Sequence, residues 1–437
     1  MDYTPHTERE IEEMLERLGL KSLEELYAHL PPELLVDGLD LPPPLGEDEV
    51  LTEVLELAGK NLRGRVFLGG GVRDHFVPAI VDELAERGEF LTTYTPYQPE
   101  ASQGVLQAIF EYQTMIAELT GLDVANASLY DGASALAEGA LLAMRATGKS
   151  RFLVSRGVHP EYREVLATYT RPHGAEIVEL PLSKGRTVKG EVAGDVAAVV
   201  VQSPNFLGAI ENYAELAEAA HAAGALFIAV VDPLSLAVLA PPGEQGADVA
   251  VGEGQPLGNH LLFGGPHFGF IAVRERLLRQ LPGRLAALTR DREGRRGFVL
   301  ALSAREQHIR RAKARSNITT NAQNAALRAT IHLAALGPKG LAEAALAAAS
   351  AARELFELVT SIPGVRPLVE PPIFAEFAVS LPKDPAWVKE ELARRGFFAA
   401  HPIPDYGEGA ALFAATERHG PEEVKALARA LAEVLGG

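Results

Sequence analysis

The chain has 437 residues, of which 47% are hydrophobic and 23% are charged, and its formal net charge is −17. This composition is ordinary for a well-cored protein, and the length allows about two or three domains. The acidic balance argues against nucleic acid or an anionic membrane as a partner. Because there is no cysteine, the chain has no disulfide, thiolate metal site or cysteine nucleophile.

The N-terminal segment, residues 1–60, is predicted to be a helical arm. The spacings Thr7 to Glu10 and Ser22 to Glu25 both match a capping box and predict two short amphipathic helices. Such an arm is too small for its own core, so we expect it to wrap another domain or subunit. Its polar, acidic start does not match a signal peptide, and the chain contains no apolar run of about 18 residues. We therefore expect a cytoplasmic protein.

A proline-rich loop follows at residues 90–104, with the sequence FLTTYTPYQPEASQG. Proline fixes its own φ and keeps the preceding residue out of the helical region, so the loop should be stiff. Two interpretations are open. Either the aromatic rings pack as in an ordinary connection, or the loop presents polar groups to a small ligand. The polar groups are those of Tyr94, Tyr97, Gln98 and Glu100.

Residues 61–330 are predicted to form a large α/β domain. Short β-rich runs begin near residues 151, 175, 196, 225, 247 and 268, and helical patterns separate several of them. Continuous apolar strands between helices predict a mostly parallel, covered sheet. Residues 331–437 are predicted to contain a connecting helix and a small α+β domain.

Polar residues follow several of these strands, where ligands bind in open α/β sheets. Asp131, Gly132 and Ser134 open a helix, which is either an anion site or an ordinary N-cap. Asp232 ends a buried strand, either as a turn residue or as a carboxylate that pairs with a protonated ring nitrogen. His159 either caps a helix or stacks on a cofactor ring.

This arrangement resembles the fold-type-I pyridoxal-phosphate enzymes. Such an enzyme needs a Schiff-base lysine after the strand-end aspartate, but no lysine lies between Lys189 and Lys313. Gln255 and Pro256 stand where the lysine is expected, and neither can form the imine. The sequence therefore predicts the scaffold without its nucleophile.

Five motifs sharpen the resemblance. They are TPYQPEASQGVLQAIFEYQTMIAELTG, SLYDGAS, SPNFLG, PPGEQGADVAVGEGQ and DREGRRGFVLALSAREQHIRRAKARSNITTN. Together they resemble the glycine decarboxylase P-protein of the glycine cleavage system, from the arm to about residue 325. In some organisms the P-protein is split into two chains. The length and the missing lysine are similar to those of the N-terminal half, subunit 1.

The resemblance implies a partner, subunit 2, which carries the pyridoxal phosphate and its lysine, in an α2β2 assembly. The complex would decarboxylate glycine and transfer its aminomethyl group to the lipoyl arm of the H-protein. The loop residues Tyr94, Tyr97, Gln98 and Glu100 would enter the partner's site, and Gly264 and Gly265 would approach the partner's phosphate. The chain's own vestigial site would comprise Asp131, Gly132, Ser134, His159, Asp232, Gln255 and Pro256.

Two other hypotheses stay open from the sequence. The chain is either a non-catalytic scaffold that stabilises subunit 2, or a stand-alone lyase or aminotransferase with a lysine in an unusual place. A basic island between Arg290 and Arg315 is either a solvated or internally paired helix face, or a docking surface for the partner or the H-protein.

Overall fold

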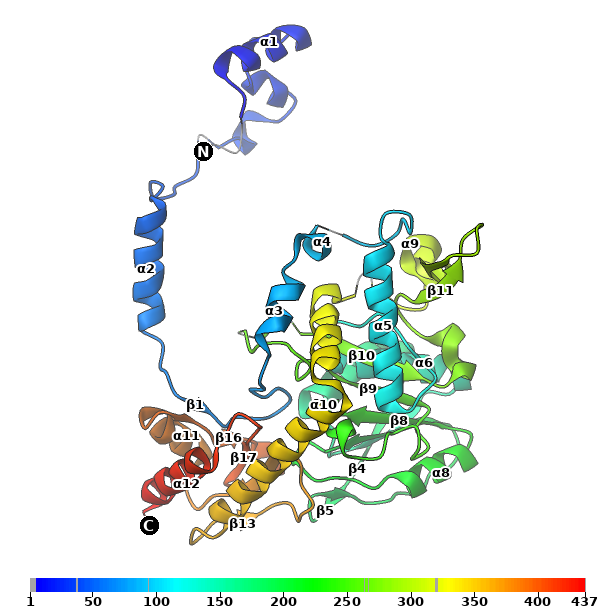
Figure 1. Ribbon diagram of the computed structural model, residues 1–437, viewed down its shortest axis with the longest axis vertical. Coiled ribbons are helices and arrows are strands. Elements are labelled where there is room, and N and C mark those ends of the chain that lie inside the picture. The colour runs from blue at the N-terminus through cyan, green and yellow to red at the C-terminus, as the bar shows by residue number, and fades with distance from the viewer. Residues whose placement is uncertain are drawn as a thin grey trace. The chain divides into compact units, whose positions relative to one another are not determined.

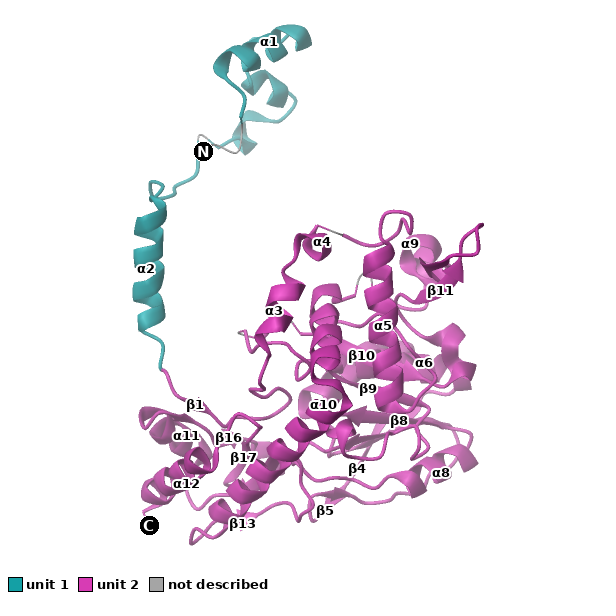
Figure 2. Ribbon diagram, viewed as in Figure 1, with its two compact units in different colours: residues 1–62 teal, residues 63–437 magenta. Residues whose placement is uncertain are grey.

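A computed structural model describes residues 5–436, apart from residues 37, 93, 263, 266, 319 and 320. The chain forms two compact units, residues 1–62 and 63–437 (Figure 2). In the part of the chain that is described, no helix combines the length and apolar character that a membrane crossing requires.

The first unit is a set of exposed helices. Helix α1 (Glu8–Leu18) begins with the predicted capping box, in which Thr7 and Glu10 cap each other. The second predicted helix is wrong, because the chain there forms only the 3-10 turn η1 (Glu24–Tyr27). Pro31 lies four residues after this turn and keeps Leu30 out of helical backbone, so the turn does not extend into a longer helix. Helix α2 (Glu47–Gly59) was not predicted.

A seven-stranded sheet organises the second unit (Figure 1). The predicted mostly parallel sheet is confirmed, because among its described strands only β10 runs in the opposite direction, antiparallel to β9 and β2. The strands, in spatial order, are β2 (Val124–Ala125), β10 (Gly269–Val273), β9 (Val249–Glu253), β8 (Leu226–Val231), β7 (Val196–Ser203), β3 (Arg151–Ser155) and β4 (Glu176–Leu180).

Helices cover both faces of this sheet, and alternate residues of each strand meet different helices. In β8, Phe227 and Ala229 pack in the same cluster as α5 (Gln103–Thr120), α8 (Ala214–Ala222) and α10 (Gln323–Thr360). Ile228 and Val230 pack on the other face with α6 (Gly132–Thr147), where α7 (Pro160–Thr170) also lies. The strands are therefore apolar throughout.

The long helix α10 leads from the large domain into the small one and is kinked at Gly337, where φ is 61° and ψ is −179°. The small domain has a four-stranded antiparallel sheet covered by two helices. Its elements are β13 (Arg366–Pro367), β14 (Glu376–Ser380), β17 (Ala410–Ala414), β16 (His401–Pro402), α11 (Pro385–Arg394) and α12 (Pro421–Leu435).

Several smaller elements complete the second unit. They are α3 (Ala79–Ala85), α4 (Gly88–Leu91), the pair β1 (Arg65–Val66) and β15 (Phe397–Phe398), and the hairpins β5 (Leu182–Ser183) with β6 (Arg186–Thr187) and β11 (Ala286–Arg290) with β12 (Arg296–Leu300). The basic island is thus not one helix face. It consists of the second hairpin and short helical turns, because hairpin residues pair across β11 and β12.

Candidate functional site

The tyrosine loop lies between α4 and α5 and is held by its prolines. Pro96 is buried, whereas the side chains beside it are not. Tyr94 is 86% exposed and Tyr97 is 47% exposed, and Gln98 and Glu100 are exposed as well. The two rings therefore lie largely outside the chain's own core.

Tyr97 contacts a buried arginine that the sequence did not single out. Arg284 is 3% exposed, and its Nη2 donates to the Tyr97 hydroxyl at 3.3 Å. Its guanidinium lies 5.4 Å from the centre of the Tyr97 ring, and its Nη1 donates to Asn321 Oδ1 at 3.0 Å. The ring of His308 lies 5.2 Å away on another side. The orientation of the Tyr97 hydroxyl is therefore set from inside the protein.

A groove of about 230 Å³ runs beside the same loop, between it and the start of α10. It is lined by Phe90, Leu91, Tyr94, Thr95, Gln323, Asn324 and Leu327. An open groove that combines an aromatic ring with amide side chains has room for an extended polar ligand segment.

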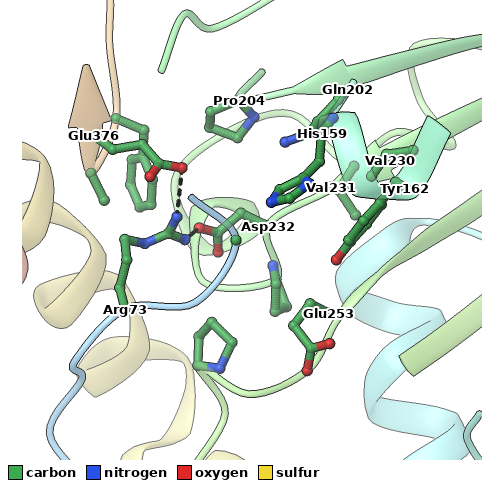
Figure 3. Close-up of a pocket in the computed structure, with 15 residues that line it drawn as sticks. Arg73, His159, Tyr162, Gln202, Pro204, Val230, Val231, Asp232, Glu253 and Glu376 are labelled. Atoms are coloured by element: carbon green, nitrogen blue, oxygen red, sulfur yellow. Dashed lines mark hydrogen bonds and ion pairs between the residues drawn. The ribbon is translucent and has the colours of Figure 1, made fainter. Parts of the chain in front are cut away.

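A second candidate site, the strand-end site, lies at the carboxyl ends of the strands, between the large and small domains (Figure 3). The structure brings together the strand-end residues His159 and Asp232, and it adds four that the sequence analysis missed. These four are Arg73, Tyr162, Glu253 and Glu376.

Arg73 lies at the centre of the strand-end site. It forms an ion pair with Asp232, and its Nη1 donates to Glu376 Oε1 at 2.9 Å. The three side chains are 6%, 11% and 8% exposed, so one guanidinium lies between two carboxylates that water barely reaches. Asp232 Oδ1 also accepts from the Leu234 amide at 2.9 Å. Asp232 is therefore both a turn residue and an ion-pair partner.

Amides at the start of α6 are hydrogen-bonded within the chain, beside an open hollow of about 520 Å³. Asp131 caps α6, because its Oδ1 accepts from the Ser134 amide at 2.7 Å. Glu253 Oε2 accepts from the Gly132 amide at 3.1 Å, and its Oε1 accepts from the Gln255 amide at 3.0 Å. Burial raises the pKa of Glu253 to about 7. The amides of this helix start thus bind two carboxyl groups.

His159 is engaged within the chain rather than on a ligand. Its Nδ1 accepts from the Glu161 amide at 3.2 Å, which places the proton on Nε2, 2.6 Å from the Gly70 carbonyl oxygen. Its ring stacks on Tyr162 at 5.0 Å. Burial and the Glu253 carboxyl raise the Tyr162 pKa well above its ordinary value.

The two residues at the expected lysine position differ in their surroundings. The buried Gln255 side chain accepts from the Arg73 amide at 3.4 Å and donates to the Asn259 carbonyl at 2.8 Å. Pro256 lines the cavity. Pro256 is therefore the position from which a lysine would reach into it.

Gly264 and Gly265 lie in an exposed loop. Gly264 has φ +87°, a backbone conformation that favours glycine. The Gly265 amide donates to the Leu262 carbonyl at 2.8 Å. That amide is therefore already used within the loop.

Solved structures with low sequence identity define the fold class. A sphingosine-1-phosphate lyase from Burkholderia pseudomallei superposes with a TM-score of 0.67 at 16% identity, over 93% of this chain and 94% of that one. An aspartate aminotransferase from Thermus thermophilus superposes with a TM-score of 0.60 at 20% identity, over 85% of this chain and 99% of that one. The expected fold-type-I architecture of pyridoxal-phosphate enzymes is confirmed.

Closer relatives define the family. The family model described as "Glycine cleavage system P-protein" matches residues 1–430, so the chain belongs to this family. It is 50% identical over 443 residues to the probable glycine dehydrogenase (decarboxylating) subunit 1 of Moorella thermoacetica, covering 100% of both chains. A crystal structure of glycine decarboxylase (P-protein), in inhibitor-bound form, superposes with a TM-score of 0.96 at 62% identity, over 99% of this chain and 100% of that one.

The cofactor of this fold class does not fit the strand-end site of this chain. No lysine is present at position 255 or 256, Asp232 already pairs with Arg73, and the start of α6 holds Glu253. The cavity between Arg73, Asp232 and Glu253 is about 40 Å³, which holds a few waters. An open hollow of about 520 Å³, whose lining includes Asp131, Ser134 and Tyr162, adjoins it at the start of α6. The misfit therefore rests on the missing lysine and on the occupied hydrogen-bonding groups, and not on a lack of space.

Proposed function

We propose that this chain is subunit 1 of a two-chain glycine decarboxylase. Its partner, subunit 2, holds the pyridoxal phosphate, and the complex releases the glycine carboxylate as CO2 and transfers the aminomethyl group to the lipoyl arm of the H-protein. The observation that carries the proposal is the absence of a lysine at positions 255 and 256, combined with an exposed tyrosine loop. Full-length similarity to chains named subunit 1 supports it.

The loop residues act, in this proposal, in the partner's site. Tyr94, Tyr97, Gln98 and Glu100 are exposed and have no cofactor of their own chain to act on. Phenol and amide groups donate hydrogen bonds to a carboxylate, such as that of glycine, and a phenol can also pass a proton. The Arg284 guanidinium holds the Tyr97 hydroxyl in place for either role. Pyridoxal phosphate, when bound by the partner, supplies the electron sink for decarboxylation.

The test is a pair of substitutions in the reconstituted complex. Tyr97→Phe removes one hydroxyl and Glu100→Ala removes one carboxylate, both from exposed positions. We expect each to lower the rate of CO2 release from carboxyl-labelled glycine by roughly 10²-fold or more if the group takes part in proton transfer. Glu422→Ala, on the exposed start of α12, is the matched control and should leave the rate unchanged.

The alternative is a scaffold subunit that only stabilises its partner. Normal turnover in Tyr97→Phe and Glu100→Ala, together with normal assembly on a sizing column, would support the scaffold and contradict a catalytic role for the loop. A lower rate with normal assembly would support the loop's role.

A further inference from the structure

We propose that two side chains of this chain substitute for the two charged ends of a pyridoxal phosphate and so keep the cofactor out of the chain's own site. The Arg73 guanidinium takes the place of the protonated ring nitrogen, against Asp232. The Glu253 carboxyl group takes the place of the phosphate, at the start of α6. The inference rests on the proposed function in one respect: the catalytic cofactor belongs to the partner.

The ring end of the site shows the first substitution. A carboxylate at the end of a buried strand needs a cationic partner, since an unpaired buried charge is strongly unfavourable. In a cofactor site that partner is the pyridinium N–H. Here Arg73 provides it and also pairs with Glu376 of β14 (Figure 3). The remaining Glu376 oxygen, Oε2, accepts from the Gly70 amide at 2.9 Å.

Arg73 therefore joins three parts of the fold. It lies on the segment that leads from β1 to α3, Asp232 follows β8 of the large sheet, and Glu376 begins β14 of the small domain. A bound cofactor would contact the large domain through Asp232. The arginine connects that same carboxylate to the small domain, so the two domains are tied together without any ligand.

The phosphate end shows the second substitution. Free amides at a helix start favour an anion because of their unpaired N–H groups and the helix dipole. Glu253 Oε2 binds the Gly132 amide at 3.1 Å, and Asp131 binds the Ser134 amide at 2.7 Å. These two carboxyl groups occupy the amides that a phosphate would bind. When they are ionised, they would also repel a phosphate.

The test measures whether these two groups, and not only the missing lysine, exclude the cofactor. The full-length isolated chain is treated with pyridoxal phosphate and borohydride, and labelled peptides are located by mass. Pro256→Lys supplies the amine alone, and Arg73→Ala/Glu253→Ser/Pro256→Lys also vacates both ends. We expect stoichiometric labelling at position 256 in the triple variant, and at least roughly tenfold weaker labelling in Pro256→Lys. Equal labelling of the two variants would overturn the proposal.

A second measurement does not depend on the folding of that triple variant. Arg73→Met leaves two buried carboxylates without their cation, and Arg73→Met/Asp232→Asn/Glu376→Gln also removes the charges. We expect the single variant to melt well below the unmodified chain, and the neutralised variant to recover most of the difference. An unchanged melting temperature in Arg73→Met would overturn the role of Arg73.

The matched control removes an ion pair of the same kind from the surface. Arg353→Ala/Glu357→Ser, on the exposed face of α10, should alter neither melting nor labelling. None of these measurements uses the partner subunit or glycine turnover. Failure here would leave the proposed function intact, and failure of the loop variants would leave this proposal intact.

Discussion

Single residues decide the chemistry of the strand-end site, because each of its buried carboxylates needs a cation or a hydrogen-bond donor beside it. Arg73 carries one positive charge between Asp232 and Glu376, and the Gly70 amide adds a hydrogen bond to Glu376. Removing one member of a buried ion cluster costs about 3–5 kcal/mol, whereas replacing all of it by neutral groups is often harmless. Asp232 therefore needs a cation beside it, and Arg73 supplies one.

A pH dependence of stability is expected from Glu253. Burial raises its pKa from the ordinary 4.5 to about 7, while the nearby Asp131 carboxylate adds repulsion. Because the folded pKa is above the unfolded one, the folded chain holds the extra proton between these values, and stability falls as pH rises from about 4.5 to about 7. The full effect is on the order of 3 kcal/mol.

The measurement is the free energy of unfolding in denaturant at several pH values. Glu253→Gln should flatten the fall between about pH 5 and 7, whereas Glu164→Gln, on the exposed face of α7, should not. The Tyr162 hydroxyl also faces Glu253, but its pKa is raised far above this range and does not contribute. An unchanged slope in Glu253→Gln would refute the assignment.

At the scale of elements, helix α10 shows how one glycine sets the path between the two domains. Gly337 interrupts the helix with φ 61° and ψ −179°, a backbone region that side chains with a Cβ disfavour. Pro338 then starts the second half, where a missing N–H is not needed. Residues of α10 up to Ala348 pack in the cluster of the large sheet, and those from Ala351 onward pack in the cluster of the small domain.

Gly337→Ala should destabilise the chain by about 1–3 kcal/mol, because alanine does not tolerate this backbone conformation. No atom lies within 4 Å of the position of the added Cβ, so the cost comes from the backbone alone. Gly104→Ala is the control. Gly104 lies in the first turn of α5, also with open space, and the change should stabilise by about 0.5–1 kcal/mol. Equal unfolding free energies of the two variants would contradict this view of the kink.

At the scale of the whole molecule, the chain divides into a self-contained body and an arm. None of the residues in the described hydrophobic clusters belongs to residues 1–62. In the arm, large apolar side chains such as Leu18, Leu34 and Leu41 are 65% or more exposed. So many exposed large apolar side chains in one short segment are typical of a segment that is buried against a partner.

Deletion of residues 1–62 should therefore weaken assembly but not folding. We expect the melting temperature of the isolated chain to change little, and the affinity for the partner subunit to fall roughly tenfold or more, because apolar burial at the interface is lost. Calorimetric melting and titration of the two subunits measure these effects. A large loss of melting temperature in the truncated chain would show that the arm belongs to the core.

The sequence alone determined the fold class and the missing nucleophile. Continuous apolar strands between helices predicted the covered parallel sheet, because this pattern depends on local composition. Six of its seven strands were found, and β2, with two residues, was too short to show a pattern. The absence of a lysine at positions 255 and 256 can be read directly from the chain.

Only the tertiary structure decided which side chains meet at the strand-end site. Arg73 is 159 residues from Asp232 and 303 residues from Glu376 along the chain, and Arg284 is 187 residues from Tyr97. A lone arginine in a glycine-rich segment carries no local pattern that identifies such partners. Ion pairs of this kind arise from the packing of distant strand ends and loops, so the sequence determined which groups were available and the fold determined which of them met.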